Sequence, residues 1–293
     1  MENNYVHREN ERALTLLSVY LNLFPDCIDA DMVNSITGGD ESTRDYAFSV
    51  LMATACGLDT LSNGADKELF RQYFVPMVKW QDAGIYRENP YYKRIGSINR
   101  KNGAWELRTM TYKPYEAFVY DDITVRADGR LLPRIGYFTE PFEYTAVLEQ
   151  GREWMTVTPN EINNMRHPIS EAFGDVLTFG LGIGYYAYMV SRKANVSSVT
   201  VVERDERVIE LFKSEILPLF EHKDKIRIVK EDAFIFADRE LPKGKFDFVF
   251  TDIWHDPSDG VELYLRMKEK EKICPKAKFE YWIEKTLRIY IGE

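Results

Sequence analysis

The sequence predicts an α/β protein whose C-terminal part is a nucleotide-binding fold with a parallel sheet, preceded by a helical region and a small β segment. One observation behind this prediction is an apolar run at residues 176–179 that ends in glycines at alternate positions, Gly180, Gly182 and Gly184. A helical pattern follows over residues 185–193. Glycines at such a turn let the backbone pass close to a ligand, because no Cβ is in the way.

The second observation is an acid at the end of the next apolar run. Residues 199–202 read as a strand that ends in Glu203, nineteen residues after Gly184, and a helical stretch follows over residues 206–217. Strand, glycine turn, helix and strand make a βαβ unit with a crevice at the carboxyl ends of its strands. A carboxylate in that place can accept hydrogen bonds from both hydroxyls of a ribose. We therefore expect a ligand that carries a ribose.

Two further apolar runs also end in acids. Residues 226–229 lead into Asp232 and Ala233, and residues 246–250 lead into Asp252. The carboxyl ends of parallel strands lie along the same edge of a sheet, so these acids are expected to line the crevice that Glu203 lines. The combination is more specific than the glycine turn alone.

An acid at the end of each successive strand resembles the class I S-adenosylmethionine-dependent methyltransferases, over residues 161–254. The resemblance implies that Glu203 holds the ribose, that Asp232 meets the adenine amino group and that Asp252 faces the reacting group. The expected cofactor is S-adenosylmethionine or its decarboxylated derivative. The predicted cofactor site comprises Gly180, Gly182, Gly184, Glu203, Asp232, Ala233 and Asp252.

One position departs from the methyltransferase pattern. Many of these enzymes have an acid where this chain has Thr178, and aminopropyltransferases such as spermidine synthase also lack an acid there. Residues 156–169 resemble the segment before the glycine turn of that branch, and residues 246–252, followed by Asp256 and Pro257, resemble its catalytic strand end. The resemblance therefore extends to the spermidine synthase-like branch.

Composition limits the classes of function. The 293 residues carry a formal net charge of −9, which disfavours generic binding to nucleic acid or to an anionic membrane. The three cysteines have no C-x-x-C spacing, and the four histidines have no metal-ligand spacing, so no metal site is predicted. The polar N-terminus and the absence of long apolar runs predict a soluble, cytoplasmic protein.

The sequence divides into a helical region at residues 1–95, a small β segment at 96–158 and the nucleotide fold at 159–293. Helices are expected at residues 9–24, between Asp40 and Gly57, and at 66–81, with a kink at Pro76. Strands are expected at 105–112, 117–120, 123–125, 131–137 and 154–157, with a hairpin turn at Asp128-Gly129.

Only 41 residues follow Asp252, so we expect a nucleotide fold that is shortened after its fourth strand. These residues offer a helix at 259–273, an apolar run at 279–283 and a last helical piece. We predict that the β segment covers the crevice in place of a C-terminal hairpin, with Asp252 and Asp256 on the opposite wall. The β segment supplies the aromatic residues Tyr112, Tyr115, Tyr120, Tyr137, Phe138, Phe142, Tyr144 and Trp154.

These features favour transfer of a methyl group, or alternatively an aminopropyl group, to a small amine-bearing acceptor, with Asp252 as the base. A non-catalytic nucleotide-binding or scaffold protein is a second hypothesis. A third is an NAD-dependent oxidoreductase, because Gly182, Gly184 and Ala187 also satisfy the pattern G-x-G-x-x-G/A. The aromatic residues of the β segment fit a homodimer interface as well as a pocket wall, so both readings stay open.

Overall fold

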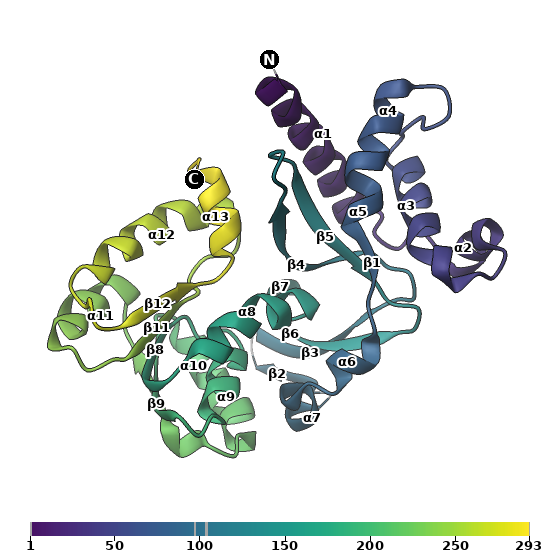
Figure 1. Cartoon of the computed structure of the whole chain (residues 1–293). Helices are drawn as coiled ribbons and strands as arrows, with labels where there is room; N and C mark the ends of the chain where they lie inside the picture. Colours follow the sequence, from purple (N-terminus) through teal and green to yellow (C-terminus); the bar gives the residue numbers. More distant parts are fainter. Residues whose placement is uncertain (1, 97, 103–104, 293) are drawn as a thin grey trace. The chain divides into compact units, whose positions relative to one another are not determined.

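A computed structural model describes residues 2–96, 98–102 and 105–292 of the chain (Figure 1). The chain forms two compact units. The first comprises Met1–Tyr86 and Met110–Glu143, and the second comprises Arg87–Thr109 and Tyr144–Glu293. These units cut across the three segments expected from the sequence, because the β segment contributes to both and residues 87–95 join the unit of the nucleotide fold.

The first unit contains helices and a three-stranded sheet. Its helices are α1 (Glu2–Leu23), α2 (Ala30–Thr37), α3 (Arg44–Ala55), α4 (Gly64–Leu69) and α5 (Val75–Met77). Shorter helical pieces are a 3-10 turn at Glu41–Thr43, a π-helical segment at Phe70–Phe74 and α6 (Ala83–Arg87), which ends at the unit boundary. In the sheet, β5 (Leu131–Tyr137) lies between β1 (Val78–Trp80), which is parallel to it, and β4 (Phe118–Val125), which is antiparallel.

The helix expected over residues 66–81 ends earlier. Its helical part stops at Met77, and Val78–Trp80 pairs with β5 as a strand. Pro76 has no N–H to donate to the preceding turn, and the π-helical segment Phe70–Phe74 already departs from α-helical geometry before it. The expected hairpin turn at Asp128-Gly129 is confirmed, with Gly129 at a φ of 83° between β4 and β5.

The second unit is organised around a five-stranded parallel sheet of order β10-β9-β8-β11-β12. Its strands are β8 (Gly174–Phe179), β9 (Val196–Glu203), β10 (Ile226–Lys230), β11 (Phe248–Thr251) and β12 (Lys278–Tyr281). The chain winds outward from β8 in both directions, as in a Rossmann-like fold. The carboxyl end of β8 therefore lies at the point where ligands bind in such sheets.

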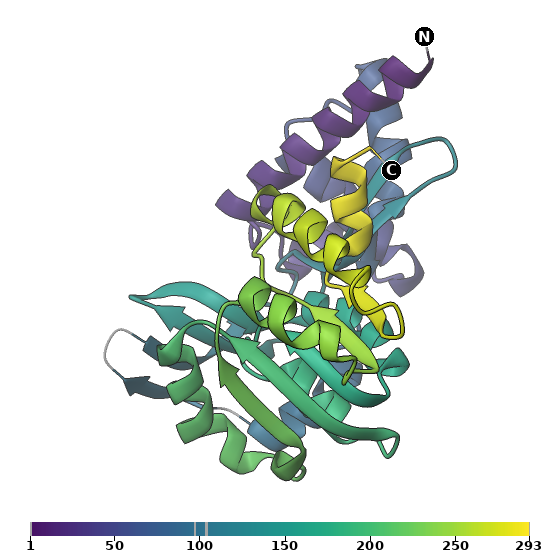
Figure 2. The same cartoon turned by 90° about the vertical axis from the view of Figure 1, so that its left-hand side faces the viewer.

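Helices cover both faces of this sheet. They are α8 (Pro159–Glu171), α9 (Tyr185–Ser191), α10 (Glu206–Leu211), α11 (Ala233–Glu240), α12 (Pro257–Glu271) and α13 (Glu284–Tyr290). Figure 1 shows α8, α9 and α10 on one side of the sheet and α11 and α12 on the other, and Figure 2 looks onto the α11–α12 side. After α10 the chain continues through a π-helical segment at Phe212–Ile216 and two 3-10 turns, at Leu217–Leu219 and Lys223–Lys225. A third 3-10 turn, Leu241–Lys243, follows α11.

The nucleotide fold does not stop at the fourth strand. The apolar run expected at residues 279–283 forms β12, which pairs in parallel with β11 and places Tyr281 opposite Thr251. Among the described residues, α13 follows β12 and no antiparallel hairpin is added to the sheet. A fifth strand therefore follows the four at which the fold was expected to be shortened.

Four strands form a further sheet of order β2-β3-β6-β7, in which β2 is antiparallel to β3 and β6 is antiparallel to β7. They are β2 (Arg100–Asn102), β3 (Trp105–Tyr112), β6 (Phe142–Glu149) and β7 (Arg152–Val157). β6 is missing from the sequence-based prediction, since only aromatic residues at its start were recognised there. The short helix α7 (Pro90–Ile95), which belongs to the second unit, precedes this sheet in the sequence.

Gly184 tests how tightly the start of α9 is packed. A Cβ at Gly184 would lie 2.2 Å from the Phe212 ring, and its φ is 79°. Gly184→Ala is therefore expected to lower the free energy of unfolding by about 3 kcal/mol, measured by urea denaturation. Gly244 is the control, because its φ of 61° is similar but no atom lies within 4 Å of its Cβ position.

For Gly244→Ala the expected loss is only about 1 kcal/mol, from backbone strain alone. Equal losses in the two variants would contradict the packing explanation.

Candidate functional site

A cavity of about 480 Å³ opens at the carboxyl ends of the parallel strands in the second unit. The predicted site residues that line it are Gly180, Gly182, Glu203, Asp232, Ala233 and Asp252. Gly184 is not among the lining residues, because it packs against Phe212 at the start of α9. One side of the cavity is formed by residues 153–157 of β7 and another by Glu161 and Met165 of α8.

The glycines of the turn serve different purposes. A Cβ at Gly180 would lie 1.9 Å from the carbonyl oxygen of Asp252, so glycine is required where β8 and β11 end side by side. At Gly182 the φ is 55°, and the nearest atom to a Cβ would be the Met155 sulfur at 3.8 Å. Gly182 is therefore the glycine beside open cavity space, where a ligand can approach the backbone.

Glu203 is held by the backbone on both sides. The Leu181 N–H donates to Glu203 Oε2 at 3.2 Å, and the Asp205 N–H donates to Glu203 Oε1 at 2.8 Å. Each carboxylate oxygen can accept a further hydrogen bond, since each has two lone pairs. The carboxylate that the sequence predicts as the ribose ligand is thus fixed in orientation before any ligand binds.

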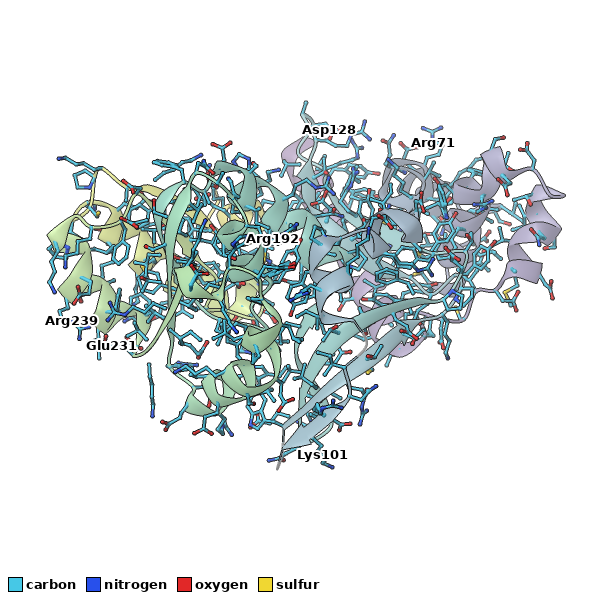
Figure 3. The ribbon with its side chains drawn as sticks, turned by 90° about the horizontal axis from the view of Figure 1, so that it is seen from below. Arg71, Lys101, Asp128, Arg192, Glu231 and Arg239 are labelled. Carbon is cyan, nitrogen blue, oxygen red and sulfur yellow. The ribbon has the colours of Figure 1, made fainter. Side chains whose placement is uncertain are left out.

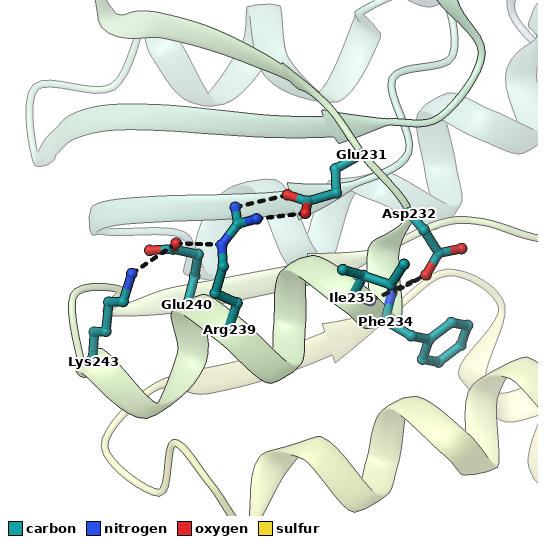
Figure 4. A network of polar contacts seen from close by, with 7 residues as sticks. All are labelled: Glu231, Asp232, Phe234, Ile235, Arg239, Glu240 and Lys243. Atoms are coloured by element: carbon teal, nitrogen blue, oxygen red, sulfur yellow. Dashed lines mark hydrogen bonds and ion pairs between the residues drawn. The ribbon is translucent and has the colours of Figure 1, made fainter.

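The two acids after β10 have different partners, and Figure 3 labels the first of them, Glu231, together with Arg239. Glu231 makes a bidentate ion pair with Arg239, at 2.6 and 2.8 Å. Asp232 caps α11, because its Oδ1 accepts from the backbone N–H groups of Phe234 and Ile235 at 2.9 and 3.1 Å. Figure 4 shows both arrangements. The cap leaves Asp232 Oδ2 available, whereas each oxygen of Glu231 already accepts one hydrogen bond from Arg239.

Asp252 and Glu161 form the electrostatic centre of the cavity. Both carboxylates are partly accessible, and among the described residues no side chain pairs with either of them. Burial, with the negative charge of Glu203, raises the pKa of Asp252 to about 7. Burial, with the charge of Asp252, raises the pKa of Glu161 well above its usual range. A cationic group entering the cavity would relieve this repulsion.

The sequence-based prediction missed Glu161 as a site residue. It lies on the first turn of α8, before the glycine turn, and no local motif marks it. The available signal was the resemblance of residues 156–169 to the segment before the glycine turn of aminopropyltransferases. That resemblance pointed to the segment and not to the residue.

The prediction that Asp256 lies on a cavity wall is wrong. Its side chain is the N-cap of α12, where Oδ1 accepts from the Ser258 N–H at 2.7 Å, and it does not line the cavity. His255 lines the cavity but is exposed, with its Nδ1 3.1 Å from Asp259 Oδ2. Trp254 is buried against Gly260 of α12 and also reaches the lining.

Among the described residues of the β segment, those that line the cavity belong to β7. Of the eight aromatic residues predicted for the wall, Trp154 alone lines the cavity of the second unit, together with neighbouring residues of its strand. Tyr115 and Tyr137 belong to the hydrophobic core of the first unit, where the Tyr137 ring stacks on Phe48 with ring centroids 4.2 Å apart. Their aromatic character reflects core packing.

Thr178 faces the turn that follows it. It is buried, and its hydroxyl lies 3.5 Å from the carbonyl oxygen of Gly180, at the limit of a hydrogen bond. Within the described parts of the chain, no group of three or more His, Cys, Asp or Glu residues could hold a metal ion. In the same residues, no helix has both the length and the apolar surface needed to cross a bilayer.

Comparison with known proteins finds a match in the residues around this cavity. Residues 161–267 match the Spermine/spermidine synthase domain. The matched stretch begins at Glu161, ends in α12 and contains every predicted site residue, although it covers less than half of the chain. The resemblance to the spermidine synthase-like branch, inferred from the sequence, is confirmed for residues 161–267. No protein among the curated sequences compared matches the chain.

Several solved structures match parts of this chain. A SAM-dependent methyltransferase from Agrobacterium tumefaciens is 21% identical with a TM-score of 0.36, covering 46% of this chain and 46% of its own. Spermidine synthase from Thermotoga maritima is 16% identical with a TM-score of 0.33, covering 63% of this chain and 55% of its own. Human methyltransferase-like protein 13 in complex with SAH is 19% identical with a TM-score of 0.29, covering 40% and 58%. This chain thus spans about half the length of these structures.

The raised pKa of Asp252 gives a test of the cavity that needs no ligand. Since its pKa in the folded state is about 7 against a usual 3.8, the folded state holds a proton that the unfolded state releases between these values. Stability is therefore expected to fall as the pH rises from 4 to 7 and to stay lower above 7. Asp252→Asn should remove this loss and raise the free energy of unfolding at pH 8 by about 2 kcal/mol.

Denaturation curves of the wild-type protein and the variant at pH 5 and pH 8 measure the difference. Asp224→Asn, at an exposed site outside the cavity, is the matched control. If the stability of the wild type relative to Asp252→Asn did not change between the two pH values, the raised pKa of this partly buried carboxylate would be contradicted.

Proposed function

We propose that the synthase-like domain binds S-adenosylmethionine, or its decarboxylated derivative, and transfers an alkyl group from it to a small amine-bearing acceptor. The observation that carries this proposal is the fixed carboxylate of Glu203 at the end of β9, beside a glycine turn with open space at Gly182. A ribose with two free hydroxyls is the ligand group that suits such a carboxylate. The domain match over residues 161–267 supports the cofactor class.

The residues present fit this cofactor. Glu203 would accept hydrogen bonds from the ribose hydroxyls with the lone pairs that Leu181 and Asp205 leave free. Asp232 would accept one from the adenine amino group with Oδ2. When bound, the sulfonium supplies a carbon already activated for transfer, so the protein mainly has to align the acceptor.

Asp252 and Glu161 are the residues that would hold an amine. An ammonium group between the two carboxylates would lower the pKa of both, because an opposite charge favours their ionised forms. Deprotonated Asp252 could then accept the proton from the acceptor nitrogen, which frees the nitrogen lone pair for attack. A pKa of about 7 leaves Asp252 about half ionised at neutral pH, which suits a general base.

We favour methyl transfer and keep aminopropyl transfer as the second candidate. The second candidate is supported by the match of residues 161–267 to a spermine/spermidine synthase domain. It is also supported by Thr178, which stands where many methyltransferases have an acid. The two reactions leave different products, since methyl transfer gives S-adenosylhomocysteine and aminopropyl transfer gives methylthioadenosine. A binding protein without turnover would give neither.

The role of Glu203 can be tested by calorimetric titration with S-adenosylmethionine. Glu203→Ala removes a charged acceptor of two hydrogen bonds and is expected to weaken binding about thirtyfold, on the order of 2 kcal/mol. Glu206→Ala removes an exposed acid three residues away that pairs with Lys230 outside the cavity, and it should bind like the wild type. If Glu203→Ala bound S-adenosylmethionine as tightly as the wild type, Glu203 would not be the ribose ligand.

A parallel titration with NAD examines the oxidoreductase alternative. Tighter binding of NAD than of S-adenosylmethionine would favour that alternative.

The catalytic role of Asp252 can be tested by product analysis with a panel of small primary amines and diamines. With an accepted amine, Asp252→Asn should lower kcat by about 100-fold or more while S-adenosylmethionine still binds, because the acceptor proton then lacks its base. Glu161→Gln should mainly raise the KM for the amine. If neutral acceptors turned over faster than amines, the acidic cavity would not determine the acceptor.

A further inference from the structure

A short segment outside the matched domain contacts three walls of the cavity. Residues 89–92 lie in the second unit, about seventy residues before the matched stretch begins. Their side chains hydrogen-bond to Ile183 in the glycine turn, to Tyr185 at the start of α9 and to Val157 at the end of β7. All three of these contacted residues line the cavity.

Tyr91 makes the central contact. Its hydroxyl donates to the carbonyl oxygen of Ile183 at 2.6 Å, and both residues are almost fully buried. The Tyr91 ring packs edge-on against Tyr185 and Tyr188 of α9, with centroids 5.4 and 5.7 Å apart. Burial also raises the pKa of Tyr91 above its usual range, so the hydroxyl stays protonated and acts as a donor.

This contact fixes one peptide plane of the glycine turn. The Ile183 carbonyl precedes α9, whose first hydrogen bond runs from the Tyr188 N–H to the Gly184 carbonyl. At the other end of the same peptide, the Gly184 N–H donates to the Leu181 carbonyl at 2.9 Å. The plane is thus held at both ends, and without the Tyr91 hydroxyl one end would be free and a buried carbonyl would lack its donor.

The two neighbours of Tyr91 hold adjacent walls. Asn89 accepts from the Tyr91 N–H at 2.9 Å through Oδ1, and its Nδ2 donates to the Tyr185 hydroxyl at 3.0 Å. The Tyr92 hydroxyl donates to the Val157 carbonyl. A single short stretch of chain therefore connects the glycine turn, α9 and β7.

We propose that Tyr91 is a positioning residue of the ligand site, whose hydroxyl holds the glycine turn in the conformation that receives the ligand. Asn89 and Tyr92 hold the walls on either side. The inference rests on the proposed function for the nature of the ligand, but the effect on the turn itself is independent of it. The ligand site would thus extend beyond residues 161–267 to the segment 89–92, which no sequence motif marks.

Tyr188 of α9 provides a matched control, because its ring also packs against Tyr91. Its hydroxyl lies 3.4 Å from the Pro90 carbonyl, so it also connects the segment with α9, but it does not reach the glycine turn. Tyr91→Phe and Tyr188→Phe each remove one hydroxyl and leave the ring in place. If Tyr91 only packed the segment against α9, the two variants would behave alike.

Amide hydrogen exchange of the ligand-free protein tests the positioning role. In Tyr91→Phe the Gly184 N–H is expected to exchange about tenfold faster, because its peptide is held at one end only. The Gly180 N–H, which donates to the Val202 carbonyl, should not change in the same sample. In Tyr188→Phe both amides should exchange as in the wild type. Unchanged exchange at Gly184 in Tyr91→Phe, or the same increase in both variants, would overturn the proposal.

Calorimetric titration with S-adenosylmethionine measures the effect of the Tyr91 hydroxyl on ligand affinity. Tyr91→Phe should bind about tenfold more weakly at a temperature where it is fully folded, and Tyr188→Phe should bind like the wild type. Wild-type affinity in Tyr91→Phe would overturn the positioning role while leaving the proposed function intact. If the wild-type protein bound no S-adenosyl compound, the proposed function would fail, and the exchange experiment would still decide whether Tyr91 holds the turn.

Discussion

The meeting of β8 and β11 at their carboxyl ends is the constraint on which the site depends. The Asp252 N–H donates to the Phe179 carbonyl at 2.9 Å, and the Asp252 carbonyl lies so close to Gly180 that no side chain fits there. This approach places Asp252 beside the glycine turn, and the Leu181 N–H of the same turn orients Glu203. One backbone contact therefore brings together acids from two strands that are not neighbours in the sequence.

The carboxylates brought together in this way repel one another, and cations among the described residues neutralise only some of them. Arg207 pairs with Asp205 and Arg239 pairs with Glu231, so cations of the protein neutralise the outer acids. Glu161 and Asp252 have no such partner among the described residues. An unpaired charge in a partly buried cavity lowers stability, and a cationic ligand would recover that loss. We therefore expect a ligand that carries a positive charge.

Sequence patterns predicted the parts of the fold that local order determines. The turn after β8, the strand ends at Glu203, Asp232 and Asp252, and the Asp128-Gly129 hairpin follow from residues close together in the chain. Sites that depend on distant contacts were not predictable in this way. Glu161 is marked by its burial and by the charge of Asp252, and Asp256 does not line the cavity because it is the N-cap of α12.

A structure with S-adenosylmethionine bound tests the central claim most directly. We predict that the ribose hydroxyls lie within about 3 Å of the Glu203 carboxylate, the adenine toward Asp232 and the sulfonium end toward Asp252 and Glu161. A ligand bound outside the cavity, or inside it with the ribose away from Glu203, would contradict the account.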